Sequence, residues 1–310
     1  MLRLLEKVRR TLSKYPIYKK CGHIYWQSRI YYDNNIRTLN YQIRFWKALI
    51  RNRFRAKTIL TYPELPSGIS VLYKIAHASG YWITNKLNRI PDVVVYYHDM
   101  TFGSRDDDTL RELKRKYHII NYNCRDISKR RVDLVFEKIF GYSISVNPLI
   151  DEGECVKKSN INAEHDGVII RCPIDKIEED YVYQKVVNNR TEDGLAMDIR
   201  TPIYGTRIPL VYFYYRDISN RFGRRKIKIR MAEVNEAFSQ EEVEKILMFC
   251  REMGLDFGEL DILRDKDDGR LYIVDANNTP SGLATVISKE EKEVALKRLS
   301  AAFEEVFIKT

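Results

Sequence analysis

The chain has 310 residues, of which 44% are hydrophobic. This length suffices for a substantial core and predicts two or three domains or subdomains. The longest uncharged stretch, Ala276 to Ser288, spans thirteen residues, whereas a bilayer-spanning helix needs about 20 apolar ones. We therefore expect no transmembrane segment. The basic N-terminus lacks the apolar core and cleavage site of a secretory signal, so we expect a cytoplasmic protein.

The net charge of +10 is concentrated at one end of the chain. Residues 1–58 carry 15 Lys and Arg against two acidic residues, or +13, which leaves 38 basic and 41 acidic residues, or −3, for the remainder. We expect a basic helical arm over residues 1–56, beginning with a short amphipathic helix. A second helix is predicted from apolar residues at spacings of three and four: Ile36, Leu39, Ile43, Trp46 and Ile50.

Three roles are open for this basic arm. It would pack on the body of the protein with a solvated basic face, attach peripherally to the anionic inner face of a membrane, or bind nucleic acid. Nucleic acid is the least favoured partner, because no RNA-binding or DNA-binding motif accompanies the charge.

Residues 57–110 are predicted to form a small α/β domain. Strands at Thr58–Tyr62 and Val93–Tyr97 flank a helix at Ser70–Ser79, with Pro and Gly at the joints, which is the pattern of a βαβ unit. His98 and Asp99 end the last strand, where open α/β sheets bind ligands. A capping and turn role is the alternative for these two residues.

Further elements are expected along the rest of the chain. Helices are predicted at 126–140, 239–253 and 289–307, the second with a capping box at Ser239 and Glu242 and a closing Gly254. Strands are predicted at both ends of 153–170, and at 180–187, 195–200 and 209–216.

A β-hairpin is predicted near the C-terminus. Glu259–Leu263 and Leu271–Ala276 read as strands, and the Asp-rich, Gly-containing segment between them favours a tight turn. A register symmetric about Asp268 would place Asp261 opposite Asp275.

The hairpin carries three candidate metal ligands. The two-residue period of a strand places Asp275 and Asn277 on one face, near Asp261. Carboxylate and amide oxygens suit Mg²⁺, which is usually held by one or two carboxylates while substrate phosphates and water complete its octahedron. The implied ligand is a metal-bound nucleoside triphosphate. The alternative is an ordinary acidic hairpin with a solvated outer face.

The pattern Asp261…Asp275-Ala-Asn277 resembles the metal-binding end of ATP-grasp enzymes, in which an Asp on one strand and E-x-N on the next hold two Mg²⁺ ions. Asp275 stands where most carboxylate ligases of that superfamily have Glu, and here the inositol polyphosphate kinase branch is more similar. The resemblance implies an α+β ATP-grasp fold over residues 111–310, with a flap subdomain at about 145–185. ATP would lie between its two α+β subdomains.

The same resemblance implies roles for residues elsewhere in the chain. Lys129 would lie near the nucleotide phosphates, and Lys158 would contact them from the flap, with Lys157 as the alternative. The adenine hinge residues would be Gln184, Lys185 and Val187, and Arg200 would lie at the transferring phosphoryl group. Arg216 is a candidate for the same group on the sequence alone, because it ends a predicted strand. It begins a basic run, which includes Arg221, that would bind anionic phosphates or an anionic substrate; a solvated loop is the alternative for this run.

ATP-grasp enzymes share γ-phosphoryl transfer from MgATP, so the resemblance implies ATP and Mg²⁺, with two ions, as cofactors. A carboxylate acceptor would give an acyl phosphate and then an amide, which makes the enzyme a ligase. A hydroxyl acceptor would make it a kinase. A scaffold that binds nucleotide without turnover is the third possibility. The expected acceptor is a small or sugar-linked molecule.

Overall fold

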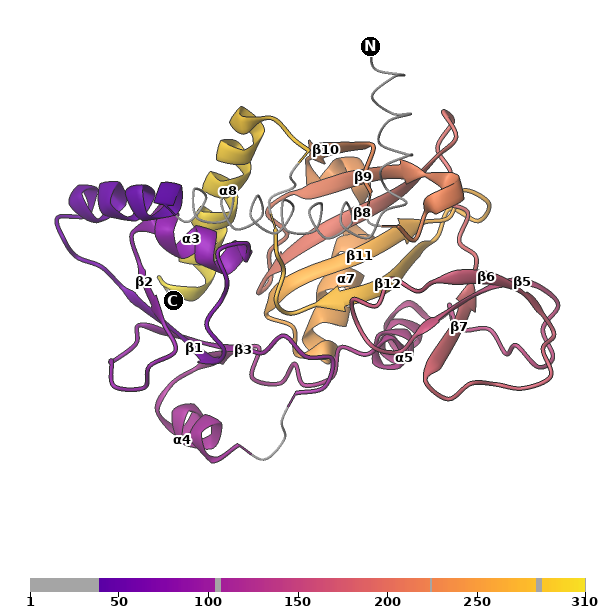
Figure 1. The fold of residues 1–310 in the computed structure, drawn as a ribbon, viewed down its shortest axis with the longest axis horizontal. Helices are drawn as coiled ribbons and strands as arrows, with labels where there is room; N and C mark the ends of the chain where they lie inside the picture. Colours follow the sequence, from indigo (N-terminus) through magenta and orange to yellow (C-terminus); the bar gives the residue numbers. More distant parts are fainter. Residues whose placement is uncertain (1–38, 104–106, 224, 283–285, 310) are drawn as a thin grey trace, which may run out of the picture.

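The fold, in a computed structural model, is α+β, with three separate β-sheets (Figure 1). The structure describes residues 39–103, 107–223, 225–282 and 286–309. The first predicted helix of the basic arm lies outside these residues. In the described part of the chain, no helix is both long enough and apolar enough to cross a membrane.

The first sheet is parallel throughout, in the order β2-β1-β3-β4. Its strands are β1 (Thr58–Pro63), β2 (Trp82–Thr84), β3 (Val93–Tyr97) and β4 (Ile119–Ile120), and the helices beside them are α3 (Val71–Ser79) and α4 (Asp108–Lys116). The predicted βαβ unit is confirmed, whereas β2 was not predicted. The division of the chain into domains stays a prediction.

The second sheet is antiparallel, in the order β10-β9-β8-β11-β12. Its strands are β8 (Leu195–Tyr204), β9 (Val211–Asp217), β10 (Lys228–Ala232), β11 (Phe257–Arg264) and β12 (Leu271–Asn277). The largest apolar core joins this sheet to α5 (Lys129–Phe140) and α7 (Gln240–Met253). A second core joins it, through α8 (Lys289–Phe307), to α3. The short α6 (Val234–Ala237) and the 3-10 turn η1 (Ile218–Asn220) lie in its connections.

The three longer helices confirm the sequence predictions closely. Ser239 and Glu242 form the predicted capping box of α7, and Gly254 ends that helix at a φ of 68°, where a residue without Cβ is favoured. A second capping box, formed by Ser288 and Glu291, begins α8.

The third sheet has only three strands, in the order β6-β5-β7. They are β5 (Gly153–Ser159), β6 (Val168–Cys172) and β7 (Tyr181–Lys185), so the predicted strand, loop and strand over 153–170 are confirmed. This sheet lies beside α5 and away from the first sheet (Figure 1).

The helix at residues 39–51 packs on the body through a face other than the predicted one. Phe45, Ala48 and Leu49 are buried, and the ring of Phe45 lies 4.6 Å from that of Trp82. The predicted apolar stripe, in its described part, is exposed instead. Apolar residues occur on both sides of this helix, so periodicity alone did not identify the packed side.

Asn121 connects the first sheet to the second. Its side chain is fully buried; Oδ1 accepts from the backbone N–H groups of Asp256 and Phe257, both at 2.8 Å, and Nδ2 donates to the carbonyl of Phe257 at 2.7 Å. Its φ is 62°, a region that Asn tolerates better than most residues.

We expect Asn121→Ala to lower the free energy of unfolding by about 3 kcal/mol or more, because two buried N–H groups and a carbonyl lose their partner. Chemical denaturation measures this loss. Asn123→Ala is the matched control, since Asn123 is an exposed neighbour. Equal losses in the two variants would contradict this role for Asn121.

Candidate active site

A single cavity of about 1280 Å³ brings all ten predicted site residues together. They are Lys129, Lys158, Gln184, Lys185, Val187, Arg200, Arg216, Asp261, Asp275 and Asn277. Its walls come from the second and third sheets, the N-terminus of α5, the loop after β3 and the first turns of α8. The volume exceeds the roughly 300–1,000 Å³ typical of one small-ligand site, so the cavity has room for more than one small ligand.

The hairpin places two carboxylates opposite each other, as predicted. Asp261 on β11 pairs with Asp275 on β12, and the register shifts immediately afterwards, so that Ile262 pairs with Ile273. The shift is a β-bulge at Val274. Its carbonyl accepts a hydrogen bond of 3.0 Å from Lys158 Nζ, which joins the hairpin to the third sheet.

The charge around the two carboxylates favours a cation. Burial raises the pKa of Asp261, the neighbouring charge of Asp275 adds to this, and Arg200 opposes it. Asp261 is ion-paired with Arg200. Asp275 Oδ1 is buried and has no hydrogen-bond partner among the described residues, and the nearest ammonium, Lys129 Nζ, is 4.0 Å away. A buried carboxylate oxygen without a partner requires an explanation, such as a bound ion.

These residues fit magnesium that arrives with a nucleotide. Asn277 Oδ1 accepts from the backbone N–H of Thr279 at 2.8 Å, which fixes the amide. The Thr279 hydroxyl lies 3.3 Å from the same oxygen but donates at the shorter distance of 2.8 Å to Asp99, so a metal ion could replace this longer contact at Oδ1. In the ranges that the structure describes, no group of three or more His, Cys, Asp or Glu side chains is placed to hold a metal. Two carboxylates and an amide match Mg²⁺, whose remaining ligands are phosphates and water.

The structure distinguishes the two flap lysines. Lys158 points into the cavity, and burial lowers its pKa to about 8. Lys157 points to the other face of β5, where it is ion-paired with Glu178 and lies 4.3 Å from the ring centroid of Tyr181. Alternation along β5 thus places Lys158, the preferred residue, at the site.

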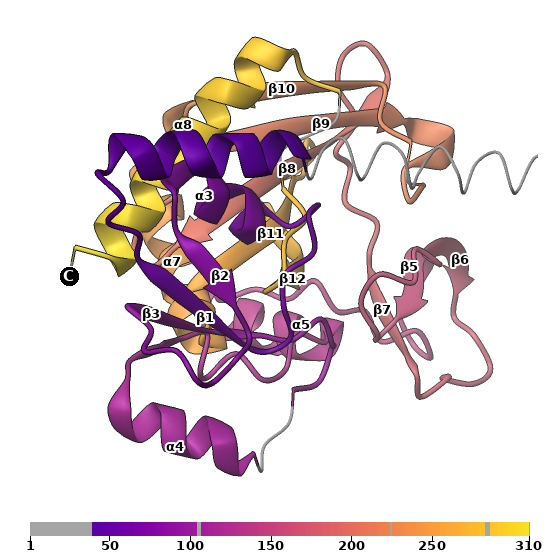
Figure 2. The same ribbon diagram turned by 60° about the vertical axis from the view of Figure 1, so that its left-hand side comes forward.

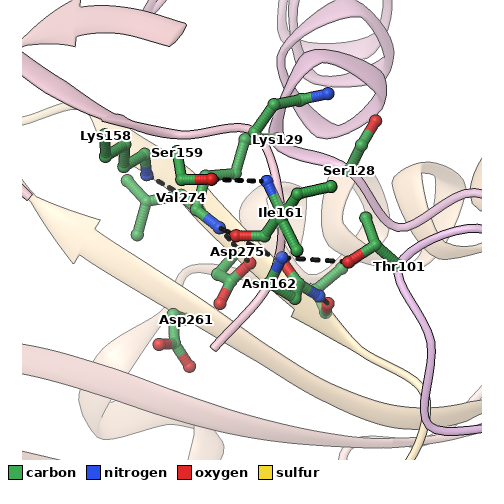
Figure 3. A network of polar contacts seen from close by, with 12 residues as sticks. Thr101, Ser128, Lys129, Lys158, Ser159, Ile161, Asn162, Asp261, Val274 and Asp275 are labelled. Atoms are coloured by element: carbon green, nitrogen blue, oxygen red, sulfur yellow. Dashed lines mark hydrogen bonds and ion pairs between the residues drawn. The ribbon is translucent and has the colours of Figure 1, made fainter. Parts of the chain in front are cut away.

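Lys129 approaches the carboxylates from the N-terminus of α5. Its Nζ donates to the carbonyl of Ile161 at 3.0 Å and to Oδ1 of Asn162 at 3.3 Å. Asn162 in turn donates through Nδ2 to the carbonyl of Ala276 at 3.1 Å. Figure 3 shows Lys158, Lys129 and Asn162 grouped around Asp275. The loop between β5 and β6 therefore lies directly over the carboxylates.

The predicted hinge residues line the cavity. The side chains of Gln184 and Lys185 interact with neighbouring side chains. Gln184 donates through Nε2 to Asp133 Oδ1 at 2.6 Å. Lys185 forms ion pairs with Asp265 at 2.8 Å and Asp268 at 2.9 Å. β7 ends its three-stranded sheet, but its outer edge pairs with residues 144–146: Val146 N–H donates to the carbonyl of Tyr183 at 2.9 Å, and Lys185 N–H donates to that of Ile144 at 2.8 Å. The hinge role of these residues stays a prediction.

Arg200 and Arg216 project from neighbouring strands of the second sheet. Arg216 is buried and ion-paired with Asp198, and burial lowers its pKa. The Nε atoms of both arginines are buried and have no hydrogen-bond partner within the described residues. Each guanidinium thus retains a donor that an oxyanion could accept.

Sequence reasoning missed Glu259 and Thr101 at this site, whereas Arg221 belongs to the predicted basic run. Glu259 lies 3.4 Å from Arg200, and the two-residue period from Asp261 along β11 would have placed it on the same face. Arg221 donates to the carbonyl of Val187 at 2.7 Å. Thr101 Oγ1 accepts from the backbone N–H of Asn162 at 3.0 Å; no sequence signal indicated that contact.

Comparisons with known proteins gave matches among solved structures only. No family model matches the chain, and no curated protein matches it. The chain is similar to D-alanine–D-alanine ligase from Bacillus anthracis in complex with ATP, with 11% identity, coverage of 80% of this chain and 95% of that one, and a TM-score of 0.47. It is also similar to a RiPP-associated ATP-grasp ligase from Chryseobacterium gregarium in complex with ADP and peptide, with 14% identity, coverage of 81% and 96%, and a TM-score of 0.48. A third structure, the macrocyclase MdnC from Microcystis aeruginosa bound to precursor peptide MdnA, has 14% identity, coverage of 83% and 100%, and a TM-score of 0.45.

Proposed function

We propose that this chain is a MgATP-dependent phosphoryl-transfer enzyme of the ATP-grasp type, and that it is an amide-forming ligase. The observation that carries the proposal is the facing pair Asp261 and Asp275, in which the buried Oδ1 of Asp275 accepts no hydrogen bond from the described residues. Lys129 of α5 and Lys158 of β5 both reach the segment of β12 that carries Asp275. This combination of carboxylates and cations suits a metal-bound triphosphate better than a solvated hairpin.

The position of each residue in the cavity suggests its role in binding the metal or the phosphates. Asp261, Asp275 and Asn277 hold Mg²⁺, with two ions expected. The magnesium supplies charge neutralisation on the phosphates. Lys129, Lys158 and Arg216 neutralise the oxygens of the transferring group. Arg200 holds Asp261 in place, since the two are ion-paired.

The adenine base would lie near the predicted hinge strand β7, between the second and third sheets. Val156, Val187, Leu263 and Val274 line the cavity as apolar walls, which suits a flat heteroaromatic ring. The polar backbone of β7 borders the same region.

Binding of the triphosphate would displace a hydrogen bond of Lys129 to the loop between β5 and β6 and one of Lys158 to the hairpin. Lys129 and Lys158 now donate to neutral backbone carbonyls. Phosphate oxygens would replace these acceptors with charge-assisted hydrogen bonds, which are about twice as strong.

The ligase reaction would proceed in two transfers. A carboxylate oxygen of the first substrate attacks the γ-phosphorus, the bond to the bridging oxygen of ADP breaks, and an acyl phosphate forms. An amine then attacks the acyl carbon, phosphate leaves, and the amine loses a proton. The acceptor is proposed to be a small or sugar-linked molecule.

Two alternatives follow from the same cavity. A hydroxyl acceptor would make the enzyme a kinase, which Asp275 in place of Glu favours. Binding of nucleotide without turnover would make it a scaffold, which the retained metal ligands disfavour.

The fate of the γ-phosphate tests the proposal. With γ-labelled ATP and pools of carboxylates, amines and sugars, a ligase releases the label as free phosphate, stoichiometric with ADP, only when a carboxylate and an amine are both present. Label retained in an acid-stable organic product would identify a kinase. MgATP binding without consumption in any pool would identify the scaffold.

A further inference from the structure

The helix at residues 39–51 exposes an apolar stripe on the outside of the protein. The exposed fractions are 60% for Leu39, 45% for Ile43, 51% for Trp46, 61% for Ile50 and 70% for Phe54, which follows the helix. At 3.6 residues per turn, the four helical positions fall within about 60° of arc. Figure 2 shows this indigo helix on the outer side of α3, which leaves its other side uncovered by the described residues.

The stripe does not contribute to the fold described above. The same helix packs on the body through Phe45, Ala48 and Leu49. Scattered exposed apolar residues are normal on a protein surface. Five large ones in a continuous row are instead typical of an interaction site.

The charge beside the stripe is uniformly positive. Between residues 39 and 63 the chain contains Arg44, Lys47, Arg51, Arg53, Arg55 and Lys57 and no acidic residue. Arg44 is ion-paired with Glu293. In the described ranges, Lys47, Arg51, Arg53 and Arg55 form no ion pair within 4.0 Å. At the helical period, Lys47 lies about 40° and Arg51 about 80° from the edge of the apolar arc, both on the same side of it.

We propose that this face docks on an anionic membrane surface, with Ile43, Trp46 and Ile50 inserted at the headgroup boundary and the cations over lipid phosphates. A helix with an apolar row next to Lys and Arg binds membranes in this way. Nucleic acid would satisfy the cations but not the Leu, Ile and Phe side chains, and a second copy of the chain would bring like charges together. The inference depends on exposure and charge, not on the proposed reaction.

Vesicle binding by the full chain tests the proposal. We expect co-flotation with vesicles of phosphatidylcholine and phosphatidylglycerol that weakens as salt is raised, and little with phosphatidylcholine alone. The triple variant Ile43→Ser, Trp46→Ser, Ile50→Ser should partition at least about tenfold less, because the inserted apolar area is lost. Leu134→Ser is the control, since Leu134 is a 65% exposed residue on α5, and it should bind like the wild type.

Tryptophan fluorescence identifies the inserted face directly. With Trp26→Phe and Trp82→Phe, the remaining Trp46 should be quenched by brominated lipid. The companion variant, with Trp26→Phe and Trp46→Phe, keeps only Trp82, which is 40% exposed, and should be quenched less.

Four results would overturn the proposal. If the triple variant binds vesicles as well as the wild type, the membrane-binding segment lies elsewhere in the chain. Equal binding to neutral and anionic vesicles would show that the basic residues do not select an anionic surface. No binding to either would exclude membrane docking. Wild-type dimers in solution that the triple variant abolishes would identify the face as a contact between two copies.

Discussion

Asp275→Asn is expected to abolish turnover while the fold stays intact. The substitution keeps the size of the side chain and removes a full negative charge from the proposed magnesium site. A metal ion contributes several kcal/mol of charge stabilisation in phosphoryl transfer, so the rate should fall about 10³-fold or more. Asp275 is a cleaner choice than Asp261, since replacing Asp261 would remove one of the two ion pairs of Arg200 and leave only that with Glu259.

Steady-state turnover at several Mg²⁺ concentrations, with circular dichroism and a melting curve, measures the effect of Asp275→Asn. Asp193→Asn, at an exposed turn residue far along the chain from the hairpin, should have wild-type turnover. Wild-type activity with normal Mg²⁺ dependence in Asp275→Asn would overturn the metal assignment.

Local patterns in the sequence predicted the hairpin and its facing carboxylates, but not the full register. A register symmetric about Asp268 predicted that Asp261 faces Asp275, and the structure confirms this pairing. Next to the turn, however, Ile262 pairs with Ile273, one residue away from that symmetry, so Asp261 faces Asp275 only because of the bulge. The bulge at Val274 was not predictable, since it depends on how the strand bends. The bulge supplies the carbonyl that Lys158 contacts, so a central link of the site lay outside the reach of pattern analysis.

Contacts between residues far apart in the sequence could not be predicted either. Arg200 reaches Asp261 because β8 pairs with β9 on one side and with β11 on the other. β11 is far from β8 in the sequence, so this pairing could not be read from neighbouring elements. The packed face of the helix at 39–51 depended in the same way on Trp82 of β2, a three-residue strand too short for its pattern to be recognised. Order along the chain predicted which residues belong to the site, but not these tertiary pairings.

The two adjacent flap lysines should differ sharply in their effect on activity. We expect Lys158→Ala to weaken MgATP binding and to lower turnover about 100-fold, because one charged donor to the developing phosphoryl charge is lost. Lys157→Ala should change both by less than about twofold, since an exposed ion pair contributes little. Isothermal titration with MgATP and steady-state kinetics measure both effects. The reverse order would show that the register of β5 is shifted by one residue.

The pH dependence of stability gives an independent test of where Lys158 lies. Burial lowers the pKa of Lys158 to about 8, from about 10.5 for a solvated lysine. The cost of burying its charge is therefore present below pH 8 and is relieved as the pH rises from 8 toward 10.5, where the unfolded chain binds more protons than the folded one. Without nucleotide, the wild type should gain stability relative to Lys158→Ala between pH 7 and pH 10 in urea unfolding, whereas Lys157→Ala should follow the wild type. A constant difference between Lys158→Ala and the wild type across this range would mean that Lys158 is solvated.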